Sequence, residues 1–192
     1  KNIISLKTIG FQCAKHINFK IVLLKFVFYV NINKNEIGVN MERSLLIIKP
    51  GFLKYEKQIK NRIKKLGAKI THEKKMVLDD VLITKHYAEH LQKDFFPELK
   101  KYMQSGEVLV MCAEREKDGL IADIRKIVGA TKNPEKGTIR HDFGIGRITE
   151  NVIHASDSVM SAERELNIFF PEMFQNAEKT KSRETKHTDY SA

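Results

Sequence analysis

The chain lacks the features that define several protein classes. Its 192 residues include two cysteines, Cys13 and Cys112, which are too few for a disulfide framework and favour a reducing compartment. The apolar run at 21–30 is interrupted by Lys25 and is far shorter than the ~20 residues of a membrane-spanning helix. No segment repeats at solenoid periods, and no G-x-G-x-x-G sequence follows a strand-like run. These absences argue against a disulfide scaffold, a solenoid and a dinucleotide-binding fold.

The length and composition predict one globular domain with appendages. Residues 1–40 are basic and poor in acidic residues. They are compatible with a targeting presequence, although they lack its usual arginines, and equally with translated upstream sequence whose original start is Met41. Residues 175–192 are polar, and we expect them to be disordered.

The basic residues are unevenly distributed over these parts. The formal net charge is +10, of which residues 1–40 contribute +5 and residues 175–192 contribute +1. The remaining +4 on residues 41–174 suits a nucleotide enzyme and is also compatible with nucleic-acid binding.

Hydrophobic periodicity predicts four strands and the helices between them. Strands are expected at about 43–48, 68–77 and 107–114, and a last strand runs into Ile153. Helices are expected at about 55–66, from Asp79 or Asp80 to about 91, from Asp94 through 95–105, and around Leu120, Ile121, Ile124 and Val128. The order β-α-β-(αα)-β-α-β predicts a ferredoxin-like α/β (α+β) sandwich, with helices on one face of a four-stranded antiparallel sheet.

The segment 151–158 contains the strongest candidate for a catalytic residue. His154 stands between a short apolar run and a helix that Asp157 or Ser158 can cap. A helix N-terminus favours anions such as phosphoryl groups. Glu165 lies two turns beyond Ser158 on the same helix face, where its carboxylate can orient a hydroxyl or an imidazole near His154. His154 is therefore a candidate nucleophile for phosphate, although its position alone is more typical of an ordinary hydrogen-bonded side chain.

The residues around His154 resemble the active-site signature of nucleoside diphosphate kinases, in which Asn, two variable residues and His precede a small residue and Ser-Asp-Ser. The Ser-Ala-Glu-Arg-Glu sequence at 161–165 agrees with that family. Other segments match it in the same order, over about residues 41–174: Lys49-Pro50, His86-Tyr87, Phe95-Phe96, Leu99, Tyr102-Met103, Arg125, Gly129-Ala130-Thr131, Asn133-Pro134, Gly137-Thr138-Ile139-Arg140 and Ile148-Thr149-Glu150-Asn151.

The resemblance implies a function and a mechanism. The family transfers the γ-phosphate of a nucleoside triphosphate to a nucleoside diphosphate by a ping-pong reaction through a phosphohistidine, which here would form on His154. Mg²⁺ would be held mainly by the nucleotide phosphates, without a protein metal site. The family's ferredoxin-like domains assemble as homo-oligomers, commonly hexamers or tetramers.

The resemblance also implies roles for individual residues. Arginine forks and a lysine suit phosphate oxygens, and a phenylalanine ring stacks on any base, so purine and pyrimidine nucleotides would both bind. Taken singly, Phe95 and Leu99 would be ordinary core residues and Arg125 an ordinary surface charge. The implied nucleotide-binding residues are Lys49, Phe95, Arg125, Thr131, Arg140 and Asn151, and the implied supporting residues are Tyr87, Leu99, Ser156 and Glu165.

Three loops depart from the family pattern. The turn at 51–55 and the loop between Thr131 and Gly137 are shorter, and the loop at 144–147 is longer. The last of these contributes to trimer contacts in the family. None of the changes removes a residue assigned to chemistry, so activity is expected and the assembly state stays open.

Other interpretations of the sequence are less well supported. His86-Tyr87-Ala88-Glu89-His90 matches the zinc-protease pattern H-x-x-E-H, but no third ligand accompanies it, and we interpret it as a coincidence on a polar helix face. In the alternative function, the protein keeps this fold as a module that binds nucleic acid or a protein partner, and catalysis is incidental.

A membrane partner is not predicted. The expected location is cytoplasmic, or organellar if residues 1–40 are a presequence.

Overall fold

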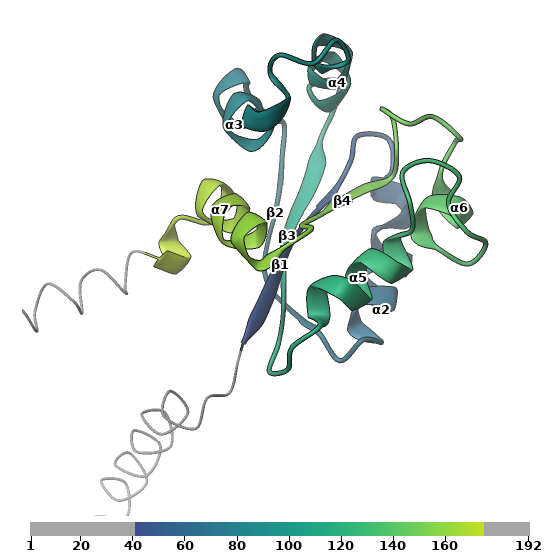
Figure 1. The fold of residues 1–192 in the computed structure, drawn as a ribbon, viewed down its shortest axis with the longest axis vertical. Coiled ribbons are helices and arrows are strands. Elements are labelled where there is room, and N and C mark those ends of the chain that lie inside the picture. The colour runs from purple at the N-terminus through teal and green to yellow at the C-terminus, as the bar shows by residue number, and fades with distance from the viewer. Residues whose placement is uncertain (1–40, 175–192) are drawn as a thin grey trace, which may run out of the picture. The chain divides into compact units, whose positions relative to one another are not determined.

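The computed structural model describes residues 41–174, so the expectations for residues 1–40 and 175–192 lie outside the described residues. The elements follow the expected order (Figure 1). They are β1 (Glu42–Ile48), η1 (Leu53–Tyr55), α2 (Glu56–Lys64), β2 (Lys69–Met76), α3 (Asp80–His86), η2 (Ala88–His90), α4 (Phe96–Met103), β3 (Val108–Arg115), α5 (Leu120–Val128), α6 (Ile139–Phe143), β4 (Ile153–Ala155) and α7 (Val159–Phe169). None of the helices within 41–174 combines the length and apolar character needed to cross a membrane.

The strands form one four-stranded antiparallel sheet in the order β2-β3-β1-β4. The central pair runs from Glu42 opposite Arg115 to Ile48 opposite Leu109. The short strand β4 pairs with the second half of β1, which places His154 opposite Ile47. This topology confirms the predicted ferredoxin-like fold.

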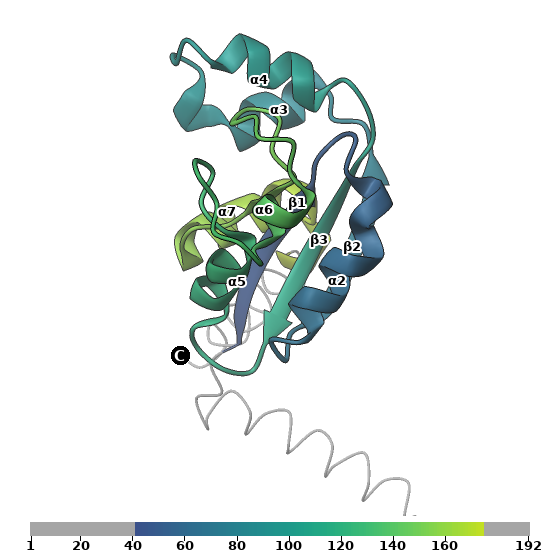
Figure 2. The ribbon, with the colours of Figure 1, turned by 90° about the vertical axis from the view of Figure 1, so that its right-hand side faces the viewer.

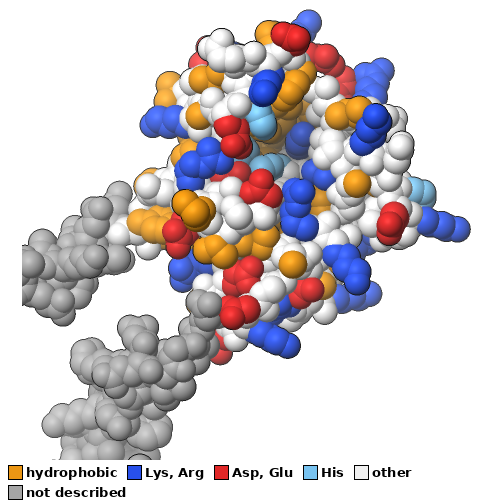
Figure 3. Space-filling model, viewed as in Figure 1, with side chains coloured by type: hydrophobic (Ala, Val, Ile, Leu, Met, Phe, Trp, Pro, Cys, Tyr) orange, Lys and Arg blue, Asp and Glu red, His pale blue; other side chains and the backbone are white. Residues whose placement is uncertain are grey.

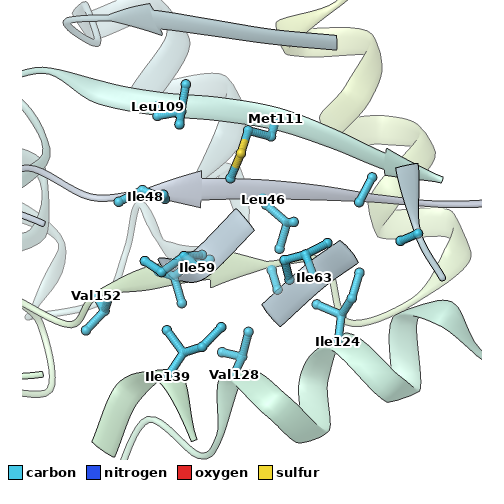
Figure 4. Packing of buried hydrophobic residues seen from close by; sticks show 14 of the residues in the cluster. Leu46, Ile48, Ile59, Ile63, Leu109, Met111, Ile124, Val128, Ile139 and Val152 are labelled. Atoms are coloured by element: carbon cyan, nitrogen blue, oxygen red, sulfur yellow. The ribbon is translucent and has the colours of Figure 1, made fainter. Parts of the chain in front are cut away.

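Helices cover both faces of the sheet, because strand β1 is apolar on both sides. Successive side chains of a strand point to opposite faces, and Leu45, Leu46, Ile47 and Ile48 of β1 are all fully buried. Leu46 and Ile48 pack with residues of α2 and α5 (Figure 4), whereas Leu45 and Ile47 pack with residues of α3, α4 and α7. The expectation of helices on one face only was therefore wrong, since a sheet with two apolar faces needs cover on both.

The helices of the α3–α4 hairpin differ from the expected ranges. Asp79 caps α3, because its carboxylate accepts a hydrogen bond from the Leu82 amide at 2.7 Å, but the helix ends at His86 rather than near residue 91. Phe95 rather than Asp94 occupies the N-cap position of α4. Figure 2 shows this hairpin beyond the end of β1, and α3 packs against α7.

Leu46 tests how much the face between the sheet and α2 contributes to stability. We expect Leu46→Ala to lower the free energy of unfolding by about 2–5 kcal/mol, because it removes fully buried methyl groups and leaves a cavity. Urea denaturation followed by circular dichroism measures the change. The control Met160→Ala alters an 81% exposed side chain and is expected to change stability by less than about 0.5 kcal/mol. Equal losses in the two variants would contradict this assignment of the core.

Candidate functional site

A cavity of about 490 Å³ lies between the end of the sheet, the α3–α4 hairpin and α7. In Figure 3, histidine side chains are visible in the hollow below this hairpin, with Lys and Arg side chains beside them. The sequence predicted functional roles for eleven residues, and all except Ser156 line the cavity: Lys49, Tyr87, Phe95, Leu99, Arg125, Thr131, Arg140, Asn151, His154 and Glu165.

The pairing of β1 with β4 brings Lys49 and His154 to the same end of the sheet. Lys49 follows β1 directly, and its amide donates a hydrogen bond to the Val152 carbonyl at 3.0 Å. His154 lies two residues further along β4, opposite Ile47. Because the two strands are antiparallel, the end of one meets the start of the other, and residues about a hundred positions apart share one site.

His154 is held by a chain of side-chain hydrogen bonds behind the cavity. Its Nε2 lies 3.0 Å from Glu165 Oε1, and the Ser156 hydroxyl donates to Glu165 Oε2 at 2.6 Å. The Leu45 amide in turn donates to the Ser156 hydroxyl oxygen at 3.0 Å. Ser156 and Glu165 are almost completely buried, so this chain is shielded from water.

These contacts distinguish the two nitrogens of the His154 ring. A carboxylate only accepts hydrogen bonds, so Nε2 is the nitrogen that donates to Glu165. In the neutral ring Nδ1 then keeps its lone pair. The arrangement therefore leaves Nδ1 as the ring nitrogen with a free lone pair.

The helix that carries Glu165 begins close to His154. The Ser158 hydroxyl caps α7 by accepting a hydrogen bond from the Ser161 amide at 3.1 Å, so Ser158 rather than Asp157 is the capping residue. Ala162, Leu166 and Phe169 are buried against the sheet, whereas Val159 is 54% exposed. This buried stripe fixes the rotation of α7 and directs Glu165 towards His154.

Three basic side chains enter the cavity without a carboxylate partner. Lys49, Arg125 and Arg140 form no salt bridge within residues 41–174. Arg140 is instead oriented by backbone carbonyls, those of Gly129 at 2.7 Å and Ile153 at 2.9 Å. Uncompensated cations in a partly buried site favour an anionic ligand.

Burial alters the acid–base properties of two of these cations. The pKa of Lys49 is lowered to about 7, mainly by burial and secondly by the nearby charge of Arg140. The pKa of Arg140 is lowered to about 10, mainly by burial and secondly by the charge of Arg125. Arg140 stays charged near neutral pH despite its shift, whereas Lys49 is partly neutral there. An anion that restores the Lys49 charge is therefore bound with uptake of a proton.

Several buried polar atoms at the cavity have no hydrogen-bond partner in the described part of the chain. They include Tyr87 OH, Asn151 Oδ1 and Arg140 Nε. Asn151 is oriented by its own Nδ2, which donates to the Ile148 carbonyl at 2.7 Å, and this leaves Oδ1 as a free acceptor. Unsatisfied buried polar groups cost free energy, so a ligand with donors and acceptors would relieve that cost.

The outer part of the cavity is apolar. Phe95 is 45% exposed and Ile148 is 56% exposed, and both line the cavity. Leu99 and Tyr87 are buried behind them. The sequence assigned no role to Ile148; its signal was an isolated apolar residue in a polar loop, three positions before Asn151.

The carboxylates of the cavity fit a divalent cation with oxygen ligands. Glu89 and Asp157 line it, and neither contacts His154 in the way Glu165 does. The hydrogen bond from Ser161 is the main reason that the pKa of Asp157 is lowered, so this carboxyl is ionised. Mg²⁺ is typically bound by one or two carboxylates, water and substrate phosphates, and this set matches that pattern.

The H-x-x-E-H sequence does not lie on a polar helix face, so the expected placement of this sequence was wrong. His86 ends α3 and is only 2% exposed, whereas His90 lies in η2 beyond the helix.

A second, larger cavity of about 700 Å³ is lined by the turn after Pro50, the end of α4 and part of the 143–150 loop. No histidine or cysteine lines it, and it is not the candidate catalytic site.

Comparison with known proteins gives consistent results. The family model "Nucleoside diphosphate kinase" matches residues 42–174. The chain is 42% identical over 137 residues to a nucleoside diphosphate kinase of Methanosphaera stadtmanae and 46% identical over 135 residues to one of Chloroflexus aggregans; each alignment covers 68% of this chain and 87% of the relative. The crystal structure of the Aquifex aeolicus nucleoside diphosphate kinase superposes with a TM-score of 0.63 at 31% identity, over 68% of this chain and 96% of that one.

The depressed pKa of Lys49 predicts proton uptake when a nucleotide binds. In the free protein an amine of pKa about 7 is mostly neutral at pH 8, and phosphate oxygens raise that pKa. At pH 8 each binding event is therefore expected to take up roughly nine-tenths of a proton at Lys49, and at pH 6 only about one-tenth. Calorimetric titration with ADP in buffers of different ionisation enthalpy measures the uptake. If Lys49→Met takes up as many protons as the unmodified protein at pH 8, the assignment to Lys49 is wrong.

Proposed function

Since this chain belongs to the nucleoside diphosphate kinase family, we propose that His154 carries the phosphoryl group in the reaction it catalyses. That reaction transfers the terminal phosphate of a nucleoside triphosphate to a nucleoside diphosphate. The observation that carries the proposal is the 3.0 Å contact of His154 Nε2 with Glu165, in a cavity that three unpaired cations share.

The reaction consists of two similar half-reactions. His154 Nδ1 attacks the γ-phosphorus, a bond between nitrogen and phosphorus forms, and the bond from the γ-phosphorus to the bridging oxygen breaks. The electron pair leaves with the nucleoside diphosphate. Glu165 accepts the Nε2 hydrogen bond throughout and stabilises the positive charge that develops on the ring. A second nucleoside diphosphate then takes the phosphoryl group by the reverse steps.

The basic residues stabilise the charge of the travelling group. Arg125 and Arg140 offer planar forks to phosphate oxygens, and Lys49 supplies a compact charge close to His154. The Thr131 hydroxyl adds a neutral donor. Phosphoryl transfer depends mainly on positioning and on such electrostatic stabilisation, which a site of fixed cations provides.

The remaining residues hold the nucleoside. The free Oδ1 of Asn151 accepts a hydrogen bond from a sugar hydroxyl, and Lys49 lies at the same end of the cavity. The exposed side chains of Phe95 and Ile148 pack against the base. These contacts are apolar and read no base edge, so both purines and pyrimidines are substrates. Tyr87 and Leu99 support this clamp from behind.

The cofactor is Mg²⁺, held mainly by the nucleotide phosphates. When bound, it would neutralise part of the charge on the phosphates. Glu89 and Asp157 are the residues that would orient its water ligands, because Glu165 is already engaged by His154 and Ser156. The family membership supports a requirement for a divalent cation, and the oxygen donors of the cavity support Mg²⁺ in particular.

Assembly and location complete the proposal. The protein is a homo-oligomer, either a hexamer or a tetramer, and its membership of the family supports this assembly. It acts in the cytoplasm, which the buried free thiol of Cys112 supports.

Phosphorylation of His154 can be tested directly. Incubation with γ-labelled ATP is expected to give one acid-labile label per chain, which passes to added GDP or CDP. His154→Ala is expected to lose both the label and the transfer, while His72→Ala on the edge strand β2 keeps them. Full transfer by His154→Ala would contradict the proposal.

The role of Glu165 predicts a specific kinetic defect. In Glu165→Gln the amide can donate to Nε2, which favours the tautomer whose proton sits on Nδ1 and removes the nucleophilic lone pair. We expect kcat to fall by roughly 10²–10⁴-fold with little change in nucleotide affinity. The matched control is Glu163→Gln, an exposed residue of the same helix. Equal kcat values for these two variants would show that the hydrogen bond is not needed.

A further inference from the structure

His86 is a buried imidazole that the proposed phosphotransfer does not use. It is 2% exposed, and neither of its ring nitrogens has a hydrogen-bond partner within residues 41–174. Its ring packs edge-on against His154, with 4.7 Å between the ring centroids and 85° between the planes, and it also contacts Tyr87 and Phe169. A buried imidazole without partners is uncommon, so this group is available to a ligand.

His86, His154 and Glu165 together form the donor set of a transition-metal site. One ligand atom from each residue lies within 4.8 Å of the others. His154 Nε2 and Glu165 Oε1 are 3.0 Å apart. Two ligands with bonds of about 2.0–2.1 Å to a tetrahedral zinc ion are separated by roughly 3.3 Å. A small movement of His86 towards this pair therefore completes a three-ligand set.

We propose that His86, His154 and Glu165 bind one zinc ion, and that zinc bound there inhibits phosphotransfer. Zinc bound to Nε2 of His154 displaces the proton that this nitrogen donates to Glu165. The neutral ring then carries its proton on Nδ1, so the lone pair that would attack phosphate is lost. The inhibition rests on the proposed function of His154, whereas zinc binding does not. The H-x-x-E-H sequence thus contributes one zinc ligand, His86, and the other two ligands are His154 on β4 and Glu165 on α7.

The chemistry of the three residues selects zinc over magnesium. Two imidazoles and one carboxylate match three-ligand zinc sites, in which a fourth position stays open, whereas Mg²⁺ prefers six oxygen ligands. His154 and Glu165 line the cavity, which gives the ion a route in. Glu165 is already oriented by the Ser156 hydroxyl, as an outer shell orients metal ligands.

Zinc binding is tested on the full chain without nucleotide, by titration with zinc against a chromophoric chelator. We expect one ion per chain whose binding requires His86. His86→Phe preserves an aromatic side chain among Tyr87 and Phe169, and it is expected to weaken zinc binding by well over the ~10-fold that loss of an outer-shell partner causes. His72→Ala is the control for surface histidines and leaves the affinity unchanged. Equal affinity in His86→Phe and the unmodified protein would overturn the site.

A second measurement addresses the geometry and covers a failure of His86→Phe to fold, which its thermal unfolding curve reveals. Cobalt(II) is expected to give the absorption of a tetrahedral nitrogen and oxygen site in the unmodified protein. That absorption is lost in His86→Gln and in His154→Ala. Retention of the tetrahedral absorption in both variants would overturn the assignment of the ligands.

The inhibition is tested by transfer from ATP to GDP at buffered free zinc. The unmodified protein is expected to lose activity as the site fills and to regain it with excess chelator, whereas His86→Phe stays active at the same free zinc. Full activity of the zinc-loaded protein would overturn the inhibition. Loss of label in His154→Ala belongs to the phosphotransfer proposal alone, so failure there would leave the zinc site standing.

Discussion

The site depends on three hydrogen bonds that connect the backbone of strand β1 to the imidazole of His154. The Leu45 amide donates to the Ser156 hydroxyl oxygen, that hydroxyl donates to one Glu165 oxygen, and the other oxygen faces His154 Nε2. Both carboxylate oxygens are thus engaged, and the ring is held with Nδ1 free. Because this chain of hydrogen bonds starts at the fully buried Leu45 of β1, the orientation of the His154 ring is tied to the core.

The same core supports groups that reduce stability. Lys49 and Arg140 are buried without counter-ions, and several polar atoms around the cavity lack partners in the described part of the chain. Each group costs free energy in the free protein and gains interactions when an anionic, hydroxyl-bearing ligand binds. Apolar packing on both faces of the sheet offsets these costs. His86, which has no hydrogen-bond partner within residues 41–174, lies directly beside the His154 ring.

Local patterns in the sequence predicted the strands and helices more accurately than they predicted how these elements pack together. Apolar spacing located the strands, and the position of Glu165 two turns beyond Ser158 predicted its approach to His154. The cover on both faces was missed, although the signal was present: Leu45 to Ile48 is apolar without alternation. The contact of His86 with His154 arises from the packing of α3 against α7, and no local pattern encodes such a tertiary contact.

The central claim is that Glu165 fixes Nε2 of His154 and leaves Nδ1 to receive the phosphoryl group. Nuclear magnetic resonance of the phosphorylated protein, labelled with nitrogen-15 in its histidines, reports which ring nitrogen is bonded to phosphorus. The structure predicts a coupling between phosphorus and Nδ1 of His154, together with a proton retained on Nε2. A phosphoryl group on Nε2 would contradict the account, because the Glu165 contact would then have no part in the reaction.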